Sequence, residues 1–252
     1  MRRYTPATIT SPSQLLWIHG GGMVIGAPPM DDLLCSETAA ELGITVASVD
    51  YRHAPEHPFP AALDDCAAVW AALTAESRNP VAIGGQSAGG GIAASLAQRL
   101  LDEGGRQPAA QWLFSPMLDD RTAADRALDD IEHFVWDNRS NRIGWRALLG
   151  REPGGATTPI YSVPARREDL SGLAPAWIGV GDIDLFYQED KTYAQRLEEA
   201  GVETEVRIAG GAPHGFESLA PQARSALQIR GEARTWLAAH LEPSARQRGA
   251  QG

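Results

Sequence analysis

Short apolar runs alternate with longer amphipathic stretches along most of the chain. Runs of five to eight residues rich in apolar side chains are typical of buried strands, and several of them end in Gly or Pro, as strands that lead into a loop often do. The strands predicted in this way cover residues 14–18, 45–51, 80–85, 110–116, 174–181 and 203–210.

Between these runs, apolar positions recur every three or four residues, which indicates helices with one buried face. The predicted helices cover residues 88–102, 188–200 and 222–241, besides one that places Leu63, Cys66, Trp70 and Leu73 on a single face. Strands separated by helices predict an α/β fold, in which a mainly parallel sheet carries helices on both faces.

Residues 118–165 break this rhythm, because they contain helical fragments and turn formers but no strand pattern. We expect them to form an insertion over one edge of the sheet. The last residues, 243–252, are small and polar and are predicted to be a flexible tail. The sequence shows no internal repeat or linker, so a single domain over residues 1–242 is expected.

The composition narrows the possible partners. The chain has 252 residues, of which 43% are hydrophobic and 21% charged, with a formal net charge of −10. That length is enough to bury a core without disulfides or metals. The negative charge and the absence of a Lys/Arg block argue against nucleic acid and an anionic membrane as partners. A neutral small molecule is the easier ligand to accommodate.

Cellular location is predicted from absent signals. Cys35 and Cys66 lie in no C-x-x-C pair, and zinc would need more ligands, so two reduced thiols and no metal are expected. The N-terminus has two arginines without an apolar stretch behind them, which argues against a signal peptide. No apolar run approaches the length of a membrane-spanning helix. These observations predict a cytoplasmic protein.

The strongest chemical motif is G-x-S-x-G at residues 85–89, placed between a predicted strand and a predicted helix. In that context the serine, Ser87, would lie on a sharp turn that exposes its hydroxyl above the sheet. Gly85 and Gly89 would be needed because the main chain folds back on itself there. The start of the following helix would place free N–H groups beside a developing negative charge.

Two nucleotide-binding alternatives fit these glycines less well. No Lys-Ser/Thr follows Gly89, as a phosphate-binding loop would require. Gly89, Gly91 and Ala94 match G-x-G-x-x-A in form, but they begin inside the helix, and residues 109–111 contain no acid for a ribose.

A serine nucleophile needs a histidine base, and the base needs an orienting carboxylate. His214 follows the last predicted strand, between Pro213 and Gly215, where a loop can bring it over the serine. The candidate acids are Asp182 and Asp184, at the carboxyl end of the preceding strand, where open α/β sheets collect their chemistry.

A run of three glycines, Gly20 to Gly22, follows His19 at the end of the first apolar run. Such a loop lets the main chain approach a substrate closely and point N–H groups at an oxyanion. A further N–H would come from Ala88, the residue after the serine. His19 is interpreted as a structural anchor of this loop.

Together, His19 to Gly22, the serine turn, Asp184 and His214 resemble the hormone-sensitive-lipase-like family of α/β-hydrolases, which includes bacterial carboxylesterases. The resemblance runs from about Arg3 to Leu241. Residues 51–62 are similar to the family's Y-R-x-A-P-E-x-x-F-P-A-A stretch, a structural loop beside the site.

The resemblance implies an α/β-hydrolase fold with a partial helical cap around residues 118–165. It assigns the triad to Ser87, Asp184 and His214, with Asp184 preferred to Asp182. The oxyanion donors would be Gly21, Gly22 and Ala88, with His19, Gly20, Gly85 and Gly89 shaping the loops. It further implies hydrolysis of short-chain acyl esters through an acyl-enzyme, without a cofactor.

The sequence departs from the family at two places. The residue before the serine is usually Asp or another small or acidic residue, and here it is Gln86, for which we expect a tuning effect only. Family members also carry several dozen more residues before the glycine loop, including part of a cap. The apparent lack of that part would leave apolar surface near the site and favour a homodimer.

Other functions remain open at this point. The protein would be a catalytically impaired hydrolase if activity requires the part of the cap that precedes the glycine loop in the family. A small-molecule receptor on the same scaffold, like the gibberellin receptors that lost the histidine, is a further alternative, although His214 is retained here.

Overall fold

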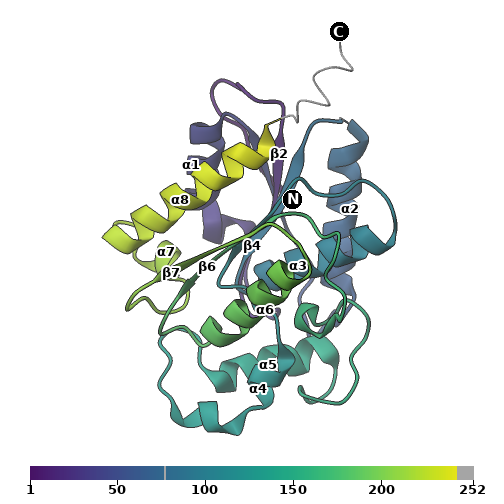
Figure 1. Cartoon of the computed structure of the whole chain (residues 1–252), viewed down its shortest axis with the longest axis vertical. Coiled ribbons are helices and arrows are strands. Elements are labelled where there is room, and N and C mark those ends of the chain that lie inside the picture. The colour runs from purple at the N-terminus through teal and green to yellow at the C-terminus, as the bar shows by residue number, and fades with distance from the viewer. Residues whose placement is uncertain (77, 243–252) are drawn as a thin grey trace.

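The computed structural model describes residues 1–76 and 78–242. Within these residues, seven strands form one sheet, which helices surround (Figure 1). The strands are β1 (Arg2–Tyr4), β2 (Gln14–Ile18), β3 (Thr45–Val49), β4 (Val81–Gln86), β5 (Gln111–Phe114), β6 (Ala176–Gly181) and β7 (Thr204–Ala209). Their order across the sheet is β1-β3-β2-β4-β5-β6-β7. Only β1 among them is antiparallel to its neighbour, so the carboxyl ends of the other strands meet at one edge.

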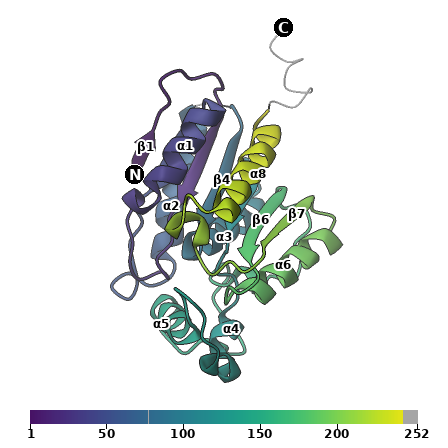
Figure 2. The same cartoon turned by 90° about the vertical axis from the view of Figure 1, so that its left-hand side faces the viewer.

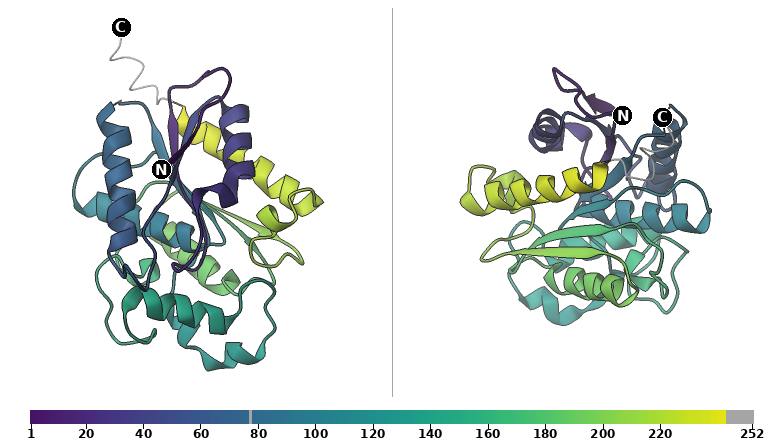
Figure 3. Two further views of the ribbon diagram at one scale, coloured as in Figure 1. Left: turned by 180° about the vertical axis from the view of Figure 1, so that it is seen from behind. Right: turned by 45° about the horizontal axis from the view of Figure 1, so that its top comes forward.

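Helices cover both faces of this sheet. They are α1 (Asp32–Leu42), α2 (Ala61–Glu76), α3 (Ala88–Asp102), α4 (Asp120–Ala124), α5 (Asn138–Leu149), α6 (Tyr187–Glu199), α7 (Phe216–Leu219) and α8 (Arg224–Leu241). The first and last long helices, α1 and α8, share one face, and α2, α3 and α6 share the other (Figures 1 and 3). The predicted α/β class is confirmed.

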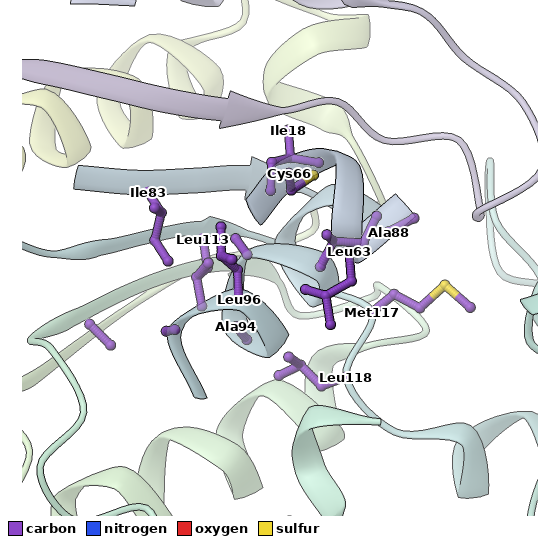
Figure 4. Packing of buried hydrophobic residues seen from close by; sticks show 14 of the residues in the cluster. Ile18, Leu63, Cys66, Ile83, Ala88, Ala94, Leu96, Leu113, Met117 and Leu118 are labelled. Atoms are coloured by element: carbon purple, nitrogen blue, oxygen red, sulfur yellow. The ribbon is translucent and has the colours of Figure 1, made fainter. Parts of the chain in front are cut away.

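The apolar runs are explained by a sheet that is buried on both sides. In β2, Leu16 and Ile18 pack toward α2 and α3, whereas Leu15 and Trp17 pack toward α1 and α8. Successive side chains of a strand point to opposite faces, so a strand covered on both faces is apolar throughout. Figure 4 shows part of the α2 and α3 face, with side chains that include Ile18, Ile83, Leu113, Leu63, Cys66 and Leu96.

The predicted strands and helices agree with the structure within a few residues. Strand β7 differs in burial, because it is an edge strand and is partly exposed rather than buried. Helix α1 was not predicted, although Pro28 and Pro29 precede it and Gly43 ends it with a φ of 63°. Proline before a helix and a left-handed glycine after it are ordinary boundary signals.

Residues 118–165 contain α4, α5 and the short 3₁₀ turn η2 (Arg126–Asp130), and this fully described segment has no strand. A second 3₁₀ turn, η3 (Pro164–Arg166), begins at its end. Figures 1 and 2 show α4 and α5 together at one end of the molecule. The predicted tail, residues 243–252, lies outside the described residues. Within the described ranges, no helix combines the length and hydrophobicity needed to cross a bilayer.

The start of this segment is fastened to α6 by Glu189. Its Oε1 accepts hydrogen bonds from the N–H groups of Leu118 at 2.7 Å and Asp119 at 3.2 Å. Burial raises the pKa of the Glu189 carboxyl to about 8, although these hydrogen bonds act in the opposite direction. Between its ordinary pKa and this raised value, Glu189 is therefore protonated in the folded protein and ionised in the unfolded chain.

This proton makes stability depend on pH. The unfolded chain releases it near the ordinary pKa of 4.5 and the folded chain near 8, so Glu189 lowers the free energy of unfolding as pH rises between those values. We expect Glu189→Gln, which can still accept both hydrogen bonds, to flatten the decline of Tm over this range. Thermal melts of both proteins across it test this, and parallel curves would contradict it.

Candidate active site

Ser87 lies on a tight turn between β4 and α3. Its φ is 55° and its ψ is −122°, a strained combination for a residue with a side chain. A Cβ added to Gly85 would lie 2.4 Å from main-chain atoms of Gly89, and one added to Gly89 would lie 2.0 Å from the carbonyl oxygen of Ile18. The two glycines of the motif are therefore required by close approach of the main chain.

The structure brings Ser87, His214 and Asp184 together in one chain of hydrogen bonds. Nε2 of His214 lies 2.9 Å from Oγ of Ser87, and Nδ1 of His214 lies 2.8 Å from Oδ2 of Asp184. The three residues follow β4, β6 and β7, and they are 4–6% exposed. Because strands far apart in sequence end at the same edge, residues 127 positions apart become neighbours.

The structure also distinguishes the two candidate acids. Asp184 is oriented by the N–H of Phe186, which donates to its Oδ1 at 2.9 Å. Asp182 is exposed and instead accepts a hydrogen bond from the N–H of Gly211 at 2.6 Å. Only Asp184 of the two therefore contacts His214.

Two other histidines, His240 and His53, pack against aromatic rings instead. His240 stacks on Trp236 with ring centroids 3.8 Å apart, and His53 packs edge-on against Tyr51 at 5.1 Å. Among the described residues, no group of three or more His, Cys, Asp or Glu side chains is placed to hold a metal ion.

The glycine loop after β2 lies directly against the serine. A Cβ on Gly20 would be 3.4 Å from Cβ of Ser87, and Gly21 has a φ of 119°, which favours glycine. Buried His19 holds the loop, with Nδ1 2.7 Å from the carbonyl oxygen of Gly20. Burial lowers the pKa of His19, so a neutral ring donates that hydrogen bond.

Tyr51, which lies two residues after the end of β3, supports the same loop. Its hydroxyl donates to the carbonyl oxygen of His19 at 3.0 Å, and its ring stacks on that of His19 with centroids 4.3 Å apart. Tyr51 is the first residue of the 51–62 stretch, which the resemblance describes as a structural loop beside the site. Its contacts with His19 connect that stretch to the glycine loop.

Trp136, from residues 118–165, lies beside the glycine loop, although no sequence pattern assigned it a role. A Cβ on Gly22 would lie 2.1 Å from Cη2 of Trp136, so the indole lies against the glycine loop. Its ring centroid is also 6.5 Å from that of His214. The only sequence signal was an aromatic residue within the insertion expected over one edge of the sheet.

The hydrogen-bond chain fixes the protonation of His214. A proton on Nδ1 can be donated to Asp184, which leaves Nε2 free to accept from the Ser87 hydroxyl. Burial acts to lower the pKa of His214, but the carboxylates of Asp184 and Glu217 outweigh it and raise that pKa above its ordinary value of 6.5.

A general base must be unprotonated, so any reaction that uses His214 should weaken as pH falls through this raised pKa. We expect kcat/KM to have an acid limb with its midpoint above 6.5. Rates measured with an uncharged ester, corrected for spontaneous hydrolysis, test this. A midpoint at or below 6.5 would show that the two carboxylates do not outweigh burial.

A serine, a histidine and an aspartate joined in this way at the carboxyl edge of a mainly parallel sheet are typical of α/β-hydrolases. The sequence matches the alpha/beta hydrolase fold family over residues 15–218. The chain belongs to that family, and to the hormone-sensitive-lipase-like group within it.

Named relatives and solved structures agree with this placement. The chain is similar to carboxylic ester hydrolase LipN of Mycobacterium tuberculosis, with 38% identity over 86% of the chain and 61% of LipN. Esterase LipI of the same organism is 35% identical over 87% of the chain and 71% of LipI. The chain therefore spans about three fifths to seven tenths of the length of these relatives.

Among solved structures, bacterial heroin esterase has a TM-score of 0.89 and 36% identity, covering 96% of this chain and 79% of that one. An esterase from the bacterial hormone-sensitive lipase family has a TM-score of 0.81 and 29% identity, covering 94% of this chain and 79% of that one. These values confirm the predicted α/β-hydrolase fold.

Proposed function

We propose that this protein is a serine carboxylesterase that hydrolyses esters with short acyl chains. The observation that carries the proposal is the continuous chain from Asp184 through His214 to Ser87, with distances of 2.8 and 2.9 Å. The relatives named carboxylic ester hydrolase and esterase support the same reaction.

In the proposed acylation step, Oγ of Ser87 attacks the ester carbonyl carbon while Nε2 of His214 takes the hydroxyl proton. Asp184 keeps the imidazole oriented and stabilises its positive charge. The tetrahedral intermediate then collapses, the bond to the alcohol oxygen breaks, and His214 returns the proton to the leaving alcohol. An acyl group remains on Ser87.

Deacylation repeats these steps with water as the nucleophile. His214 takes a proton from the water as its oxygen attacks the acyl carbon, and it returns the proton to Oγ of Ser87 as the carboxylic acid leaves. No step in this scheme calls for a cofactor.

The oxyanion of each intermediate would be held by the N–H groups of Gly21, Gly22 and Ala88. Ala88 is the first residue of α3, and the first N–H groups of a helix have no partner within it. Losing one donor of this kind costs about 2.7–4 kcal/mol of transition-state stabilisation. His19, Gly20, Gly85 and Gly89 would act indirectly, by shaping the two loops.

Trp136 supports the choice of small esters. Its indole lies against Gly22 and 6.5 Å from the ring of His214, so it fills space beside the reacting atoms. We infer that residues 118–165 act as a partial cap on a single domain of residues 1–242, and that Trp136 is its contribution to the site.

A series of p-nitrophenyl esters tests this proposal. We expect kcat/KM to be highest for acetate or butyrate and to fall for octanoate and dodecanoate. Absence of turnover with every ester, together with saturable binding of a small molecule, would favour the receptor alternative. A preference for the long chains would contradict the assignment of substrate size.

A homodimer and a cytoplasmic location stay predictions. Ile25, Phe134 and Val135 are exposed apolar residues on the segments that carry the glycine loop and Trp136, and contact between two copies would cover them. Chromatography with light scattering tests the dimer, and a monomer mass at all concentrations would contradict it.

A further inference from the structure

The side chain of Gln86 lies where the serine turn meets the histidine loop. Gln86 is the last residue of β4 and directly precedes Ser87. Its Nε2 donates a hydrogen bond to Oε1 of Glu217 and another, at 3.2 Å, to Oγ of Ser218. Both acceptors belong to α7, which begins two residues after His214.

The amide of Gln86 also lies close to the loops on either side. A Cβ on Gly215, the residue after His214, would lie 3.5 Å from Nε2 of Gln86. A Cβ on Gly20, in the glycine loop, would lie 3.8 Å from Oε1 of the same side chain. One side chain therefore lies beside the loops of the proposed base and the proposed oxyanion donors, while its own backbone leads into the proposed nucleophile.

Glu217, the partner of Gln86, is held in place from the opposite side. It is 1% exposed, and its main-chain carbonyl oxygen accepts a hydrogen bond from Nη1 of Arg230 at 2.8 Å. Arg230 lies in α8, is equally buried, and donates from Nη2 to the carbonyl oxygen of Pro221 at 3.0 Å. Helix α8 thus fixes the backbone of α7.

A buried carboxyl at this place affects the electrostatics of the site. Burial raises the pKa of Glu217 to about 7, against the lowering effects of His214 and the hydrogen bond from Gln86. The charged groups around it are His214 and Asp184 on the loops and Arg230 on α8. Glu217 is in turn one of the groups that raise the pKa of His214.

We propose that Glu217 is a positioning residue that acts through Gln86 to hold the serine turn and the histidine loop in register. This inference rests on the proposed roles of Ser87 and His214. Burying a carboxyl costs free energy unless it is paired, so the contact with Gln86 fixes where α7 can lie relative to β4. Transfer of the proton needs Oγ and Nε2 to stay near 2.9 Å, and a misplacement of about 1 Å can cost about 10²-fold in rate.

Exchanging the side chains of Gln86 and Glu217 tests whether their hydrogen bond positions the two loops. Gln86→Glu alone opposes two carboxylates, and we expect kcat at alkaline pH to fall about 10²-fold with a much smaller change in KM. Glu217→Gln alone leaves an amide pair that can still bond, so kcat should fall less than about tenfold. That variant should also move the acid limb of the pH profile to lower pH, because a negative charge near His214 is lost.

The double variant Gln86→Glu/Glu217→Gln restores an amide–carboxylate pair with its direction reversed. We expect its kcat to return to within about threefold of the original protein. Losses that simply multiply would overturn the proposal. If Gln86→Glu does not fold, Gln86→Met removes the pair without adding charge, and further loss on adding Glu217→Gln to it would overturn the proposal equally.

A matched control is available on the surface. Gln195 and Glu199 form an exposed amide–carboxylate pair on α6 at 2.8 Å, and exchanging them should leave kcat and KM unchanged. If the original protein hydrolyses no ester, the proposed function fails by itself. The Tm values of the same variants then test the pairing of Gln86 with Glu217. Recovery of Tm in the double variant supports this pairing, and additive losses of Tm overturn it.

Discussion

Replacing Ser87 by alanine should reduce the hydrolysis of p-nitrophenyl acetate by about 10⁵-fold or more, to a rate set by binding and the oxyanion donors alone. The reason is that the proposed reaction has no other nucleophile. Oγ of Ser87 is the atom that faces Nε2 of His214, at 2.9 Å, and alanine removes it. Initial rates at saturating substrate give the comparison.

Its control is a check that the change is local. Alanine can still occupy the turn that Gly85 and Gly89 make possible. Because alanine also has a Cβ, it keeps the backbone strain at a φ of 55° that Ser87 has. The Tm should therefore change little. A folded Ser87→Ala protein that retained ester turnover would show that the nucleophile lies elsewhere.

Replacing Asp184 by asparagine should have the next largest effect. We expect kcat to fall by about 10⁴-fold with little change in structure. The amide can donate to Nδ1 of His214, which forces the proton onto Nε2. In that tautomer the imidazole cannot accept the proton of the Ser87 hydroxyl. The loss should appear in kcat rather than KM, because in the proposed mechanism Asp184 acts through His214, which it contacts.

Asp182→Asn is the matched control for this prediction. Asp182 follows the same strand two positions earlier, but its carboxylate accepts from Gly211 and does not contact His214. We expect its kcat to stay within about threefold of the original protein. Equal losses in both variants would mean that the strand end, rather than the histidine, responds to the change.

Much of the fold could be predicted from the sequence because each central strand is covered on both faces. That burial makes the strands continuously apolar, as in Leu15 to Ile18, and it makes the helices between them one-sided. Helix α1 was missed because apolar and buried positions do not coincide in it: Thr38 is buried, whereas Leu33 is exposed. The partial exposure of β7 depends on its place at the sheet edge, which strand patterns do not reveal.

The site was predictable where a residue type is tied to a local motif. Ser87 and the glycines around it are required by a strand–turn–helix that is visible in the sequence. The residues alone left the choice between Asp182 and Asp184 open, since both follow β6 and differ only in which loop they face. The resemblance preferred Asp184, and the contact with His214 agrees with that choice.

Trp136 and Glu217 could not have been placed in this way. Their contacts with Gly22 and Gln86 join segments more than 100 residues apart, and no spacing rule connects them. Gln86 was noticed as a departure from the family, but its effect was expected to be a tuning one. The structure shows that its amide contacts Glu217 and Ser218 of α7, and the exchange experiment tests what the contact with Glu217 does.

The central claim is that Ser87 is a nucleophile activated by His214. Its most direct test is mass spectrometry of the intact protein after treatment with a fluorophosphonate, followed by peptide mapping. The account predicts a single adduct on the peptide that contains Ser87, formed at a rate that falls sharply in His214→Ala and lost in Ser87→Ala. A protein that stays unmodified, or an adduct on another residue, would contradict it.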